Sequence, residues 1–123
     1  LEDEAAEYGE LVLEEIERAG GLAPSIFWYE LRNVLVISER RHRITPEQTA
    51  VFLGALEALP IVIAPLPSEL GGLQLARSQG LSVHDAAYLE LALRRGIALA
   101  TLDSKLRAAA QRIAVPLFPE KNA

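Results

Sequence analysis

The sequence predicts an α/β fold in which a central, mainly parallel sheet is flanked by helices. Segments with apolar residues at helical spacing alternate along the chain with short apolar runs bounded by proline or glycine. Parallel strands need a crossover connection, which is usually a helix, so this alternation favours parallel pairing. Half of the 123 residues are hydrophobic, which is enough for one core. We therefore expect a single domain over residues 1–123.

The first half of the chain predicts three helices and two short strands. An apolar stripe at helical spacing predicts the first helix, and Gly20 stops it. Ser25 is a candidate cap for the second helix. Thr45 and Gln48 form a capping box around Pro46 at the first helical position of the third. A β-branched run between prolines predicts the second strand. These elements are helix 4–19, strand 22–23, helix 25–41, helix 46–58 and strand 61–64.

The second half predicts three more helices and two more strands. Ser68 and Ser82 are candidate caps for two helices, which Gly80 and Gly96 end. A short, mainly apolar run at 97–101 precedes Asp103, and the last apolar run contains prolines, which confine it to the edge of a sheet. These elements are helix 68–80, helix 82–95, strand 97–101, helix 104–113 and edge strand 115–118.

Composition limits the class of protein. The chain has no cysteine, so disulfides and thiolate metal sites are excluded and an intracellular, cytoplasmic protein is expected. No apolar run approaches the roughly 20 residues that a membrane span requires. Residues 1–20 carry eight acids and one base, whereas the remainder carries nine acids and eleven bases. The net charge of −5 is thus local, and it does not exclude a nucleic-acid substrate.

Three acids are the best candidates for a functional site: Glu30, Asp85 and Asp103. Asp103 follows a predicted strand, and ligands in open α/β sheets gather at the carboxyl ends of strands. If the fold brings the three carboxylates together, they repel one another unless a divalent cation or protons neutralise them. The sequence therefore predicts a metal site.

Each acid also has a structural interpretation. Asp103 is a good N-cap for the helix that begins near Ser104, and the spacing from Ser82 to Asp85 matches a capping pattern. Glu30 lies beyond the first turn of an apolar helix, so it is either partly exposed or buried with a partner. Asn33 falls one turn later on the same face.

Basic residues near these acids are weaker candidates. Arg41 and Arg43 belong to a basic turn that fits either phosphate contact or a solvated helix end. His84, beside Asp85, is a candidate for orienting a water or a phosphate. The chain contains no glycine-rich phosphate loop and no nucleophile elbow.

Taken together, these motifs resemble those of a PIN-domain ribonuclease, specifically a VapC-type toxin of a toxin–antitoxin pair. The matching pieces are Glu30-x-x-Asn33, Ser82-x-His84-Asp85-Ala86 and Ala100-Thr101-Leu102-Asp103. The resemblance implies RNA cleavage that depends on Mg²⁺ or Mn²⁺, with Glu30, Asp85 and Asp103 as catalytic, metal-binding acids. It implies supporting polar roles for Asn33, Thr101 and Ser104. It also implies a cognate antitoxin as partner and a homodimer.

The resemblance also implies an opening strand that carries a first catalytic aspartate. No such strand precedes Glu2, so we expect a domain that lacks its N-terminal strand, by roughly a dozen residues judged from the length of a strand and its turn. A truncated relative is the alternative. A catalytically inert PIN-like protein-binding module remains the main alternative function. Phosphoryl chemistry of the receiver type fits less well, because no strand-end aspartate has a suitably placed lysine.

Overall fold

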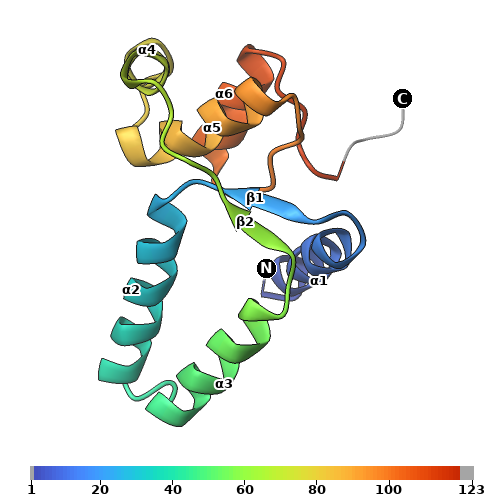
Figure 1. Cartoon of the computed structure of the whole chain (residues 1–123), viewed down its shortest axis with the longest axis vertical. Coiled ribbons are helices and arrows are strands. Elements are labelled where there is room, and N and C mark those ends of the chain that lie inside the picture. Colours follow the sequence, from blue (N-terminus) through green and yellow to red (C-terminus); the bar gives the residue numbers. More distant parts are fainter. Residues whose placement is uncertain (1, 120–123) are drawn as a thin grey trace.

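The structure is a computed structural model that describes residues 2–119. It confirms the α/β fold. The elements are, in chain order, α1 (Glu2–Ala19), β1 (Gly21–Ala23), α2 (Ile26–Arg40), α3 (Pro46–Glu57), β2 (Ile61–Ile63), α4 (Glu69–Gln79), α5 (Val83–Arg95) and α6 (Ser104–Arg112). Figure 1 shows the strands in the middle of the molecule, with α4–α6 at one end and the α2–α3 hairpin at the other. Every predicted helix is present, with its bounds shifted by three residues or fewer.

The described sheet is smaller than predicted. It contains β1 and β2, paired in parallel with Gly21 opposite Ile61 and Ala23 opposite Ile63. The predicted strands 97–101 and 115–118 are wrong as strands, because they are reduced to one parallel bridge between Leu99 and Leu117. Pro116 interrupts the second segment and cannot donate to a ladder, so the pairing does not extend. Two short parallel pairs therefore take the place of one continuous sheet.

Helix capping agrees with the sequence at some positions and not at others. Thr45 Oγ1 accepts from the Gln48 amide at 3.1 Å, and Gln48 Oε1 accepts from the Thr45 amide at 2.9 Å, which confirms the capping box. Ser25 and Ser68 make no side-chain cap bond, so they precede their helices without capping them. The backbone of Ser25 is already helical, which turns its side chain away from the free amides of the first turn.

The core lies around α5. Leu89 is fully buried, and α5 packs against both α4 and α6. The other core side chains come from the same end of the molecule. They are Leu81, Ala86, Ala92, Leu99, Leu106, Ala109, Ala110 and Val115.

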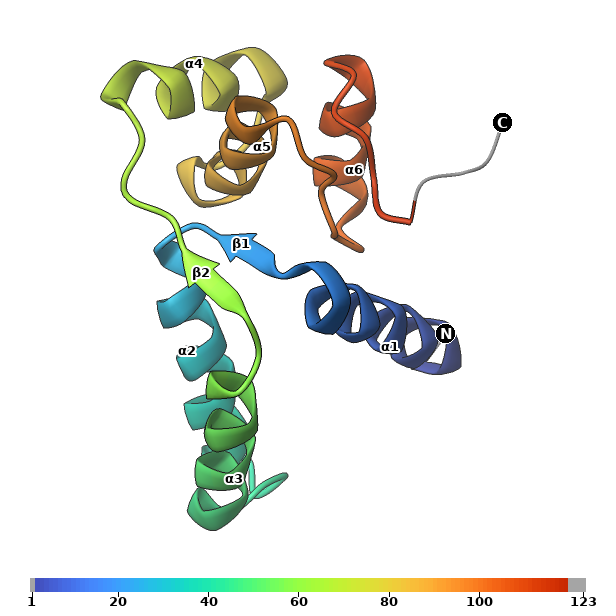
Figure 2. The same cartoon turned by 45° about the vertical axis from the view of Figure 1, so that its right-hand side comes forward.

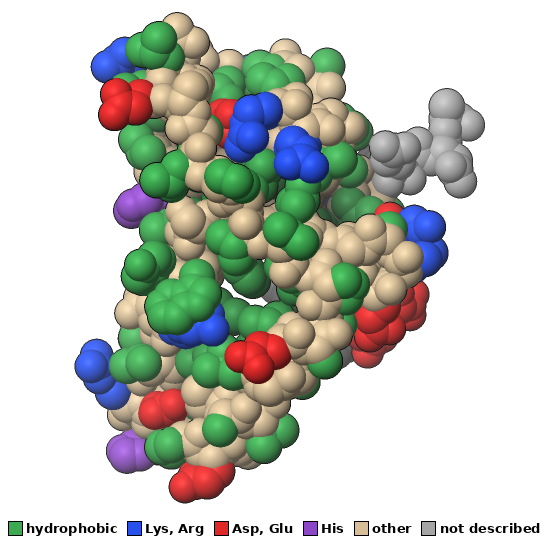
Figure 3. Space-filling view, in the orientation of Figure 1, with side chains coloured by type: hydrophobic (Ala, Val, Ile, Leu, Met, Phe, Trp, Pro, Cys, Tyr) green, Lys and Arg blue, Asp and Glu red, His purple; other side chains and the backbone are tan. Residues whose placement is uncertain are grey.

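The other end of the molecule has little core of its own. The α2–α3 hairpin projects away from the strands, as Figure 2 shows. Leu35 is the one buried residue of α2, and α3 has none. Large apolar side chains stand exposed there, including Tyr29, Val34 and Val51, and Figure 3 shows hydrophobic side chains over much of this face. Among the described helices, none combines the length and the apolar character needed to cross a membrane.

Candidate active site at the carboxyl edge of the strands

The three predicted acids come from elements that meet at one edge of the strands. Glu30 is in the second turn of α2, the helix that follows the carboxyl end of β1. Asp85 is in the first turn of α5. Asp103 follows the segment 97–101 and begins α6. This is the edge at which parallel α/β folds form ligand sites.

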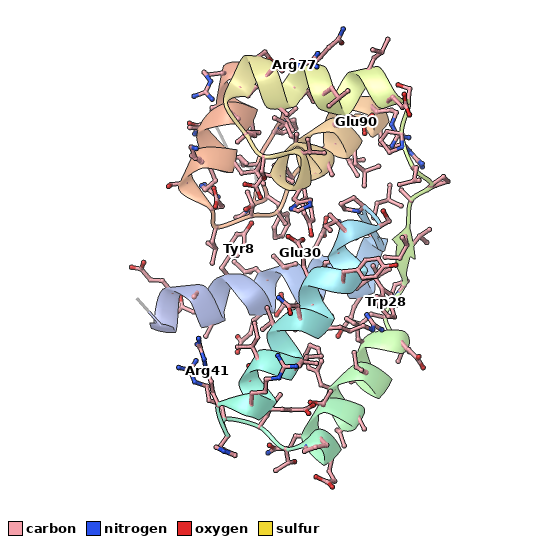
Figure 4. All side chains as sticks on the ribbon, turned by 90° about the vertical axis from the view of Figure 1, so that its left-hand side faces the viewer. Tyr8, Trp28, Glu30, Arg41, Arg77 and Glu90 are labelled. Carbon is pink, nitrogen blue, oxygen red and sulfur yellow. The ribbon has the colours of Figure 1, made fainter. Side chains whose placement is uncertain are left out.

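Tyr88 connects Glu30 to Asp85. Its hydroxyl donates a hydrogen bond to Glu30 Oε1, across from α5 to α2. Figure 4 shows Glu30 on the side of α2 that faces α5. Burial raises the pKa of Tyr88 well above its usual value, and the hydrogen bond and negative charge of Glu30 and the charge of Asp85 raise it further. Glu30 and Asp85 therefore act on the same hydroxyl.

Tyr88 was not among the site residues predicted from the sequence. The available signal was its position three residues after Asp85, which puts both side chains on one face of α5. Its partner was not deducible, because Glu30 is 58 positions away. Glu30 itself is exposed and not buried, so its partner holds it at the surface and does not compensate for burial.

The first turn of α5 keeps the Asp85 carboxylate out of the capping interaction. Ser82 Oγ accepts from the Asp85 backbone amide at 3.1 Å. The cap therefore uses the hydroxyl of Ser82 and the backbone of Asp85. Within the described part of the chain, no hydrogen bond engages the Asp85 carboxylate. The side chain is half-buried, and it remains available for a ligand.

Asp103 fulfils its structural interpretation. Its Oδ1 accepts from the Leu106 amide at 2.9 Å, so it is the N-cap of α6. Its own backbone amide donates to Thr101 Oγ1 at 3.1 Å. Arg107, which was not predicted, donates from Nη1 to the Thr101 carbonyl oxygen at 2.9 Å. Thr101 and Arg107 thus fix the loop that presents Asp103.

The remaining predicted residues are more scattered. Asn33 and Ser104 are exposed on α2 and α6. Arg41 and Arg43 follow the far end of α2, about 16 Å from Glu30 along the helix axis at the usual helical rise. Figure 4 shows Arg41 at that end. His84 lines a separate cavity of about 340 Å³ together with the Glu90–Arg94 ion pair.

The donor set fits a hard divalent cation by its chemistry, since all three acids offer carboxylate oxygens. The arrangement is incomplete by its geometry. Among the residues that the structure describes, no three histidine, aspartate or glutamate side chains are close enough together to hold a metal ion. Glu30 accepts a hydrogen bond from Tyr88 and Asp85 lies one turn before Tyr88 on α5, whereas Asp103 is engaged in its cap.

The fold and this edge define an α/β protein with a candidate acidic hydrolytic site. The chain belongs to the PIN domain family, whose model matches residues 2–112. PIN domains are generally nucleases, so membership indicates nuclease activity as the general class. Neither the curated proteins nor the solved structures gave a match to this chain.

Proposed function

We propose that this protein is a metal-dependent endoribonuclease that hydrolyses phosphodiester bonds in RNA. The observation that supports it best is the hydrogen bond from the Tyr88 hydroxyl to Glu30, which joins α5 to α2 one turn away from Asp85. Glu30 and Asp85 both carry negative charge near this hydroxyl, and carboxylates are the ligands that Mg²⁺ and Mn²⁺ prefer. Because the chain belongs to a family of nucleases, the role proposed for these acids is the cleavage of a nucleic acid.

In this proposal Glu30, Asp85 and Asp103 would hold Mg²⁺ or Mn²⁺, which would lower the pKa of a water and neutralise charge on the phosphate. Tyr88 orients Glu30 by donating a hydrogen bond to one of its carboxylate oxygens. The α6 cap positions Asp103, and Arg107 steadies its loop. Hydrogen bonds of this kind orient the groups that bind a metal and tune their basicity.

The finer proposal is a cytoplasmic toxin held by a cognate antitoxin and assembled as a homodimer. Its support is the exposed apolar surface of the α2–α3 hairpin, where Tyr29, Val34 and Val51 are 65%, 58% and 74% exposed. Several large apolar side chains exposed on one part of a molecule are typical of an association surface. The same surface supports the second candidate function, an inert module that works by binding another protein.

Cleavage of a fluorescent single-stranded RNA tests the nuclease. We expect cleavage with Mg²⁺ or Mn²⁺ and none with EDTA. Asp85→Asn and Glu30→Gln should each lower the rate by at least about 100-fold, as loss of a metal ligand does. Glu57→Gln, at the exposed end of α3, is the matched control and should cleave normally. Both variants preserve side-chain volume, so circular dichroism should be unchanged.

The outcome separates the two functions. Cleavage that survives both substitutions would refute the assigned site. A folded protein that cleaves with neither metal, yet binds a partner through the α2–α3 surface, is the inert module. Val51→Asp on that surface should then abolish the binding and leave the fold intact, because Val51 is exposed.

A further inference from the structure

Two aromatic side chains stand exposed at the beginning of α2, next to Glu30 in the sequence. Trp28 is 46% exposed and Tyr29 is 65% exposed. Their rings contact each other edge to face, with centroids 5.0 Å apart and planes inclined at 68°. An aromatic pair left open at the surface beside a candidate active site indicates contact with another molecule.

Arg32 adds a cation to this aromatic pair. Its guanidinium carbon lies 3.8 Å from the centroid of the Trp28 ring, and its Nη1 donates to the Trp28 carbonyl oxygen at 3.2 Å. Among the residues that the structure describes, neither ion pair involves Arg32. The guanidinium is thus held by an aromatic ring and by its own helix, and no carboxylate in that part of the chain neutralises it. A planar cation in this state is suited to bind a phosphate.

Helix geometry connects these side chains to Glu30. Successive residues of a helix are about 100° apart around its axis, so Tyr29 lies between Trp28 and Glu30. Figure 4 shows Trp28 and Glu30 on different sides of α2. Residues one turn later are offset by only about 40°, which places Arg32 beside Trp28 and Asn33 beside Tyr29. One strip, here named the α2 strip, therefore leads around the helix to Glu30 through Trp28, Arg32, Tyr29 and Asn33.

The α2 strip offers a partner for each part of a nucleotide. Exposed aromatic rings stack on bases of any sequence, because every base has a π-face. Arg32 offers a charge to the phosphate, and the Asn33 amide, which is exposed, offers a donor and an acceptor to a base edge or a 2′-hydroxyl. An apolar protein surface would cover the rings but leave the charge of Arg32 without a counter-ion. The strip is therefore complementary to a nucleic acid.

We propose that the α2 strip binds unpaired nucleotides of an RNA strand beside the bond that is cleaved. A base stacks on Tyr29 next to Trp28, and a phosphate binds at Arg32. The inference rests on the proposed nuclease function for the position of the cleaved bond near Glu30. The binding itself requires no cleavage, so the two can be tested separately.

The strip also determines which form of RNA binds. The bases of a duplex are stacked on one another, so their faces are not open to a protein ring, whereas unstacked bases of single strands and loops are. Tyr29 and Trp28 can therefore contact a base only where the strand is unpaired. We expect the protein to bind single-stranded RNA in preference to a duplex of the same sequence.

Tryptophan fluorescence tests the stacking directly. Trp28 is the only tryptophan of the chain, so the intrinsic signal reports on the strip alone. The titrations are made in EDTA, where no cleavage is expected. We expect a short single-stranded RNA to quench Trp28, and we expect the same RNA as a duplex, or an oligonucleotide of equal length without bases, to leave it nearly unchanged. Equal quenching by the single strand and the base-free strand would overturn the stacking.

Substitutions separate the stacking from the charge. Tyr29→Ala should weaken RNA binding by about 10-fold or more, the usual loss for one stacked base, whereas Tyr29→Phe keeps the ring and should bind as the wild-type protein does. Arg32→Gln should lower the slope of log Kd against log salt by about 0.7, as the loss of one phosphate contact to a single strand does. Arg77→Gln, at an exposed position of α4, is the matched control and should change neither quantity.

Binding and cleavage can fail independently in these assays. Single-stranded RNA that quenches Trp28 but is not cleaved in Mg²⁺ or Mn²⁺ would support the strip and refute the nuclease. Cleavage at the wild-type rate by both Tyr29→Ala and Arg32→Gln, with no quenching of Trp28, would overturn the strip and leave the nuclease in place. Circular dichroism of each variant verifies that its fold is retained.

A second copy of the chain is the competing occupant of the rings, because Tyr29 also borders the apolar surface of the α2–α3 hairpin. In that case Trp28 fluorescence would change with protein concentration in the absence of RNA. Tyr29→Ala would then reduce self-association in analytical ultracentrifugation, and single-stranded RNA would not displace the second copy. This combination of results would overturn RNA binding at the α2 strip. We expect instead that RNA quenches Trp28 equally at low and high protein concentration.

Discussion

The Tyr88 hydroxyl donates a hydrogen bond to Oε1 of Glu30, and this bond links α5, the best-packed helix, to α2, which has few buried residues. Glu30 is exposed, so its position depends on a partner more than on packing. Tyr88 is half-buried on α5 and packs against the core cluster. The rigid end of the molecule thereby fixes an acid that belongs to the projecting hairpin.

Removing the Tyr88 hydroxyl should impair the site and spare the fold. Tyr88→Phe keeps the ring in its packing position and leaves Glu30 without its donor. We expect RNA cleavage to fall by about 10- to 100-fold, the usual effect of losing a group that orients a metal ligand. The loss of stability should be about 1 kcal/mol, as for one hydrogen bond near the surface. Cleavage rates and urea unfolding measure the two effects, and an unchanged cleavage rate would show that Glu30 needs no such support.

The raised pKa of Tyr88 predicts a loss of stability at alkaline pH. Below pH 10 Tyr88 is protonated in both the folded and the unfolded protein, so its raised pKa has no effect on the free energy of unfolding. Above pH 10 the unfolded chain releases the proton, while burial and the charges of Glu30 and Asp85 keep it on the folded protein. Stability should therefore fall as pH rises beyond 10.

Urea unfolding between pH 8 and pH 11.5 measures this dependence. In Tyr88→Phe the free energy of unfolding should fall less steeply above pH 10 than in the wild-type protein. Tyr8, whose pKa burial also raises, should account for part of what remains, and Tyr8→Phe is the matched comparison. An identical decline in the wild-type protein and in Tyr88→Phe would contradict the assignment.

The helices were predictable because their signals are local. The Thr45–Gln48 box and the stop at Gly96 act within a few residues, and both are present in the structure. The strands 97–101 and 115–118 were not predictable in the same way. A strand forms only with a neighbour, and the apolar run around Leu99 contains no information about which neighbour it has.

The candidate site also contains features that local sequence signals predict and features that depend on tertiary packing. The acids could be found from their positions near helix starts, and the cap at Asp103 follows from local chemistry. The bond between Tyr88 and Glu30 depends on how α5 and α2 come together, which the sequence pattern does not give. Exposure of Glu30 is likewise a property of the packing, since the apolar surroundings in the sequence left both exposure and burial with a partner open.

Two substitutions at Asp103 should separate its cap from its proposed role in catalysis. Asn and Asp are equally good N-caps, so Asp103→Asn should keep the bond to the Leu106 amide and lose only about 0.5 kcal/mol from the helix dipole. Asp103→Ala loses the acceptor and should cost about 1 kcal/mol or more. We expect both to abolish cleavage, as measured beside their unfolding curves. Full cleavage by Asp103→Asn would leave this residue with the cap alone.

Because the core lies around α5, we expect two leucines of this helix to contribute very differently to the free energy of unfolding. Leu89 is fully buried, whereas Leu93, one turn later, is half-exposed. Both substitutions to alanine change helix propensity by the same small amount, so the difference between them reports burial. Leu89→Ala should lower the free energy of unfolding by about 2 to 5 kcal/mol, and Leu93→Ala by less than about 1 kcal/mol.

Urea unfolding followed by circular dichroism measures both variants. The slope of the unfolding free energy against urea should not change, because neither substitution alters the surface exposed on unfolding by much. Since a domain of this size is stabilised by only about 5 to 15 kcal/mol, Leu89→Ala should remove a large share of it. Equal losses from the two variants would mean that α5 is not the centre of the core, and the packing of α4 and α6 on it would then be in question.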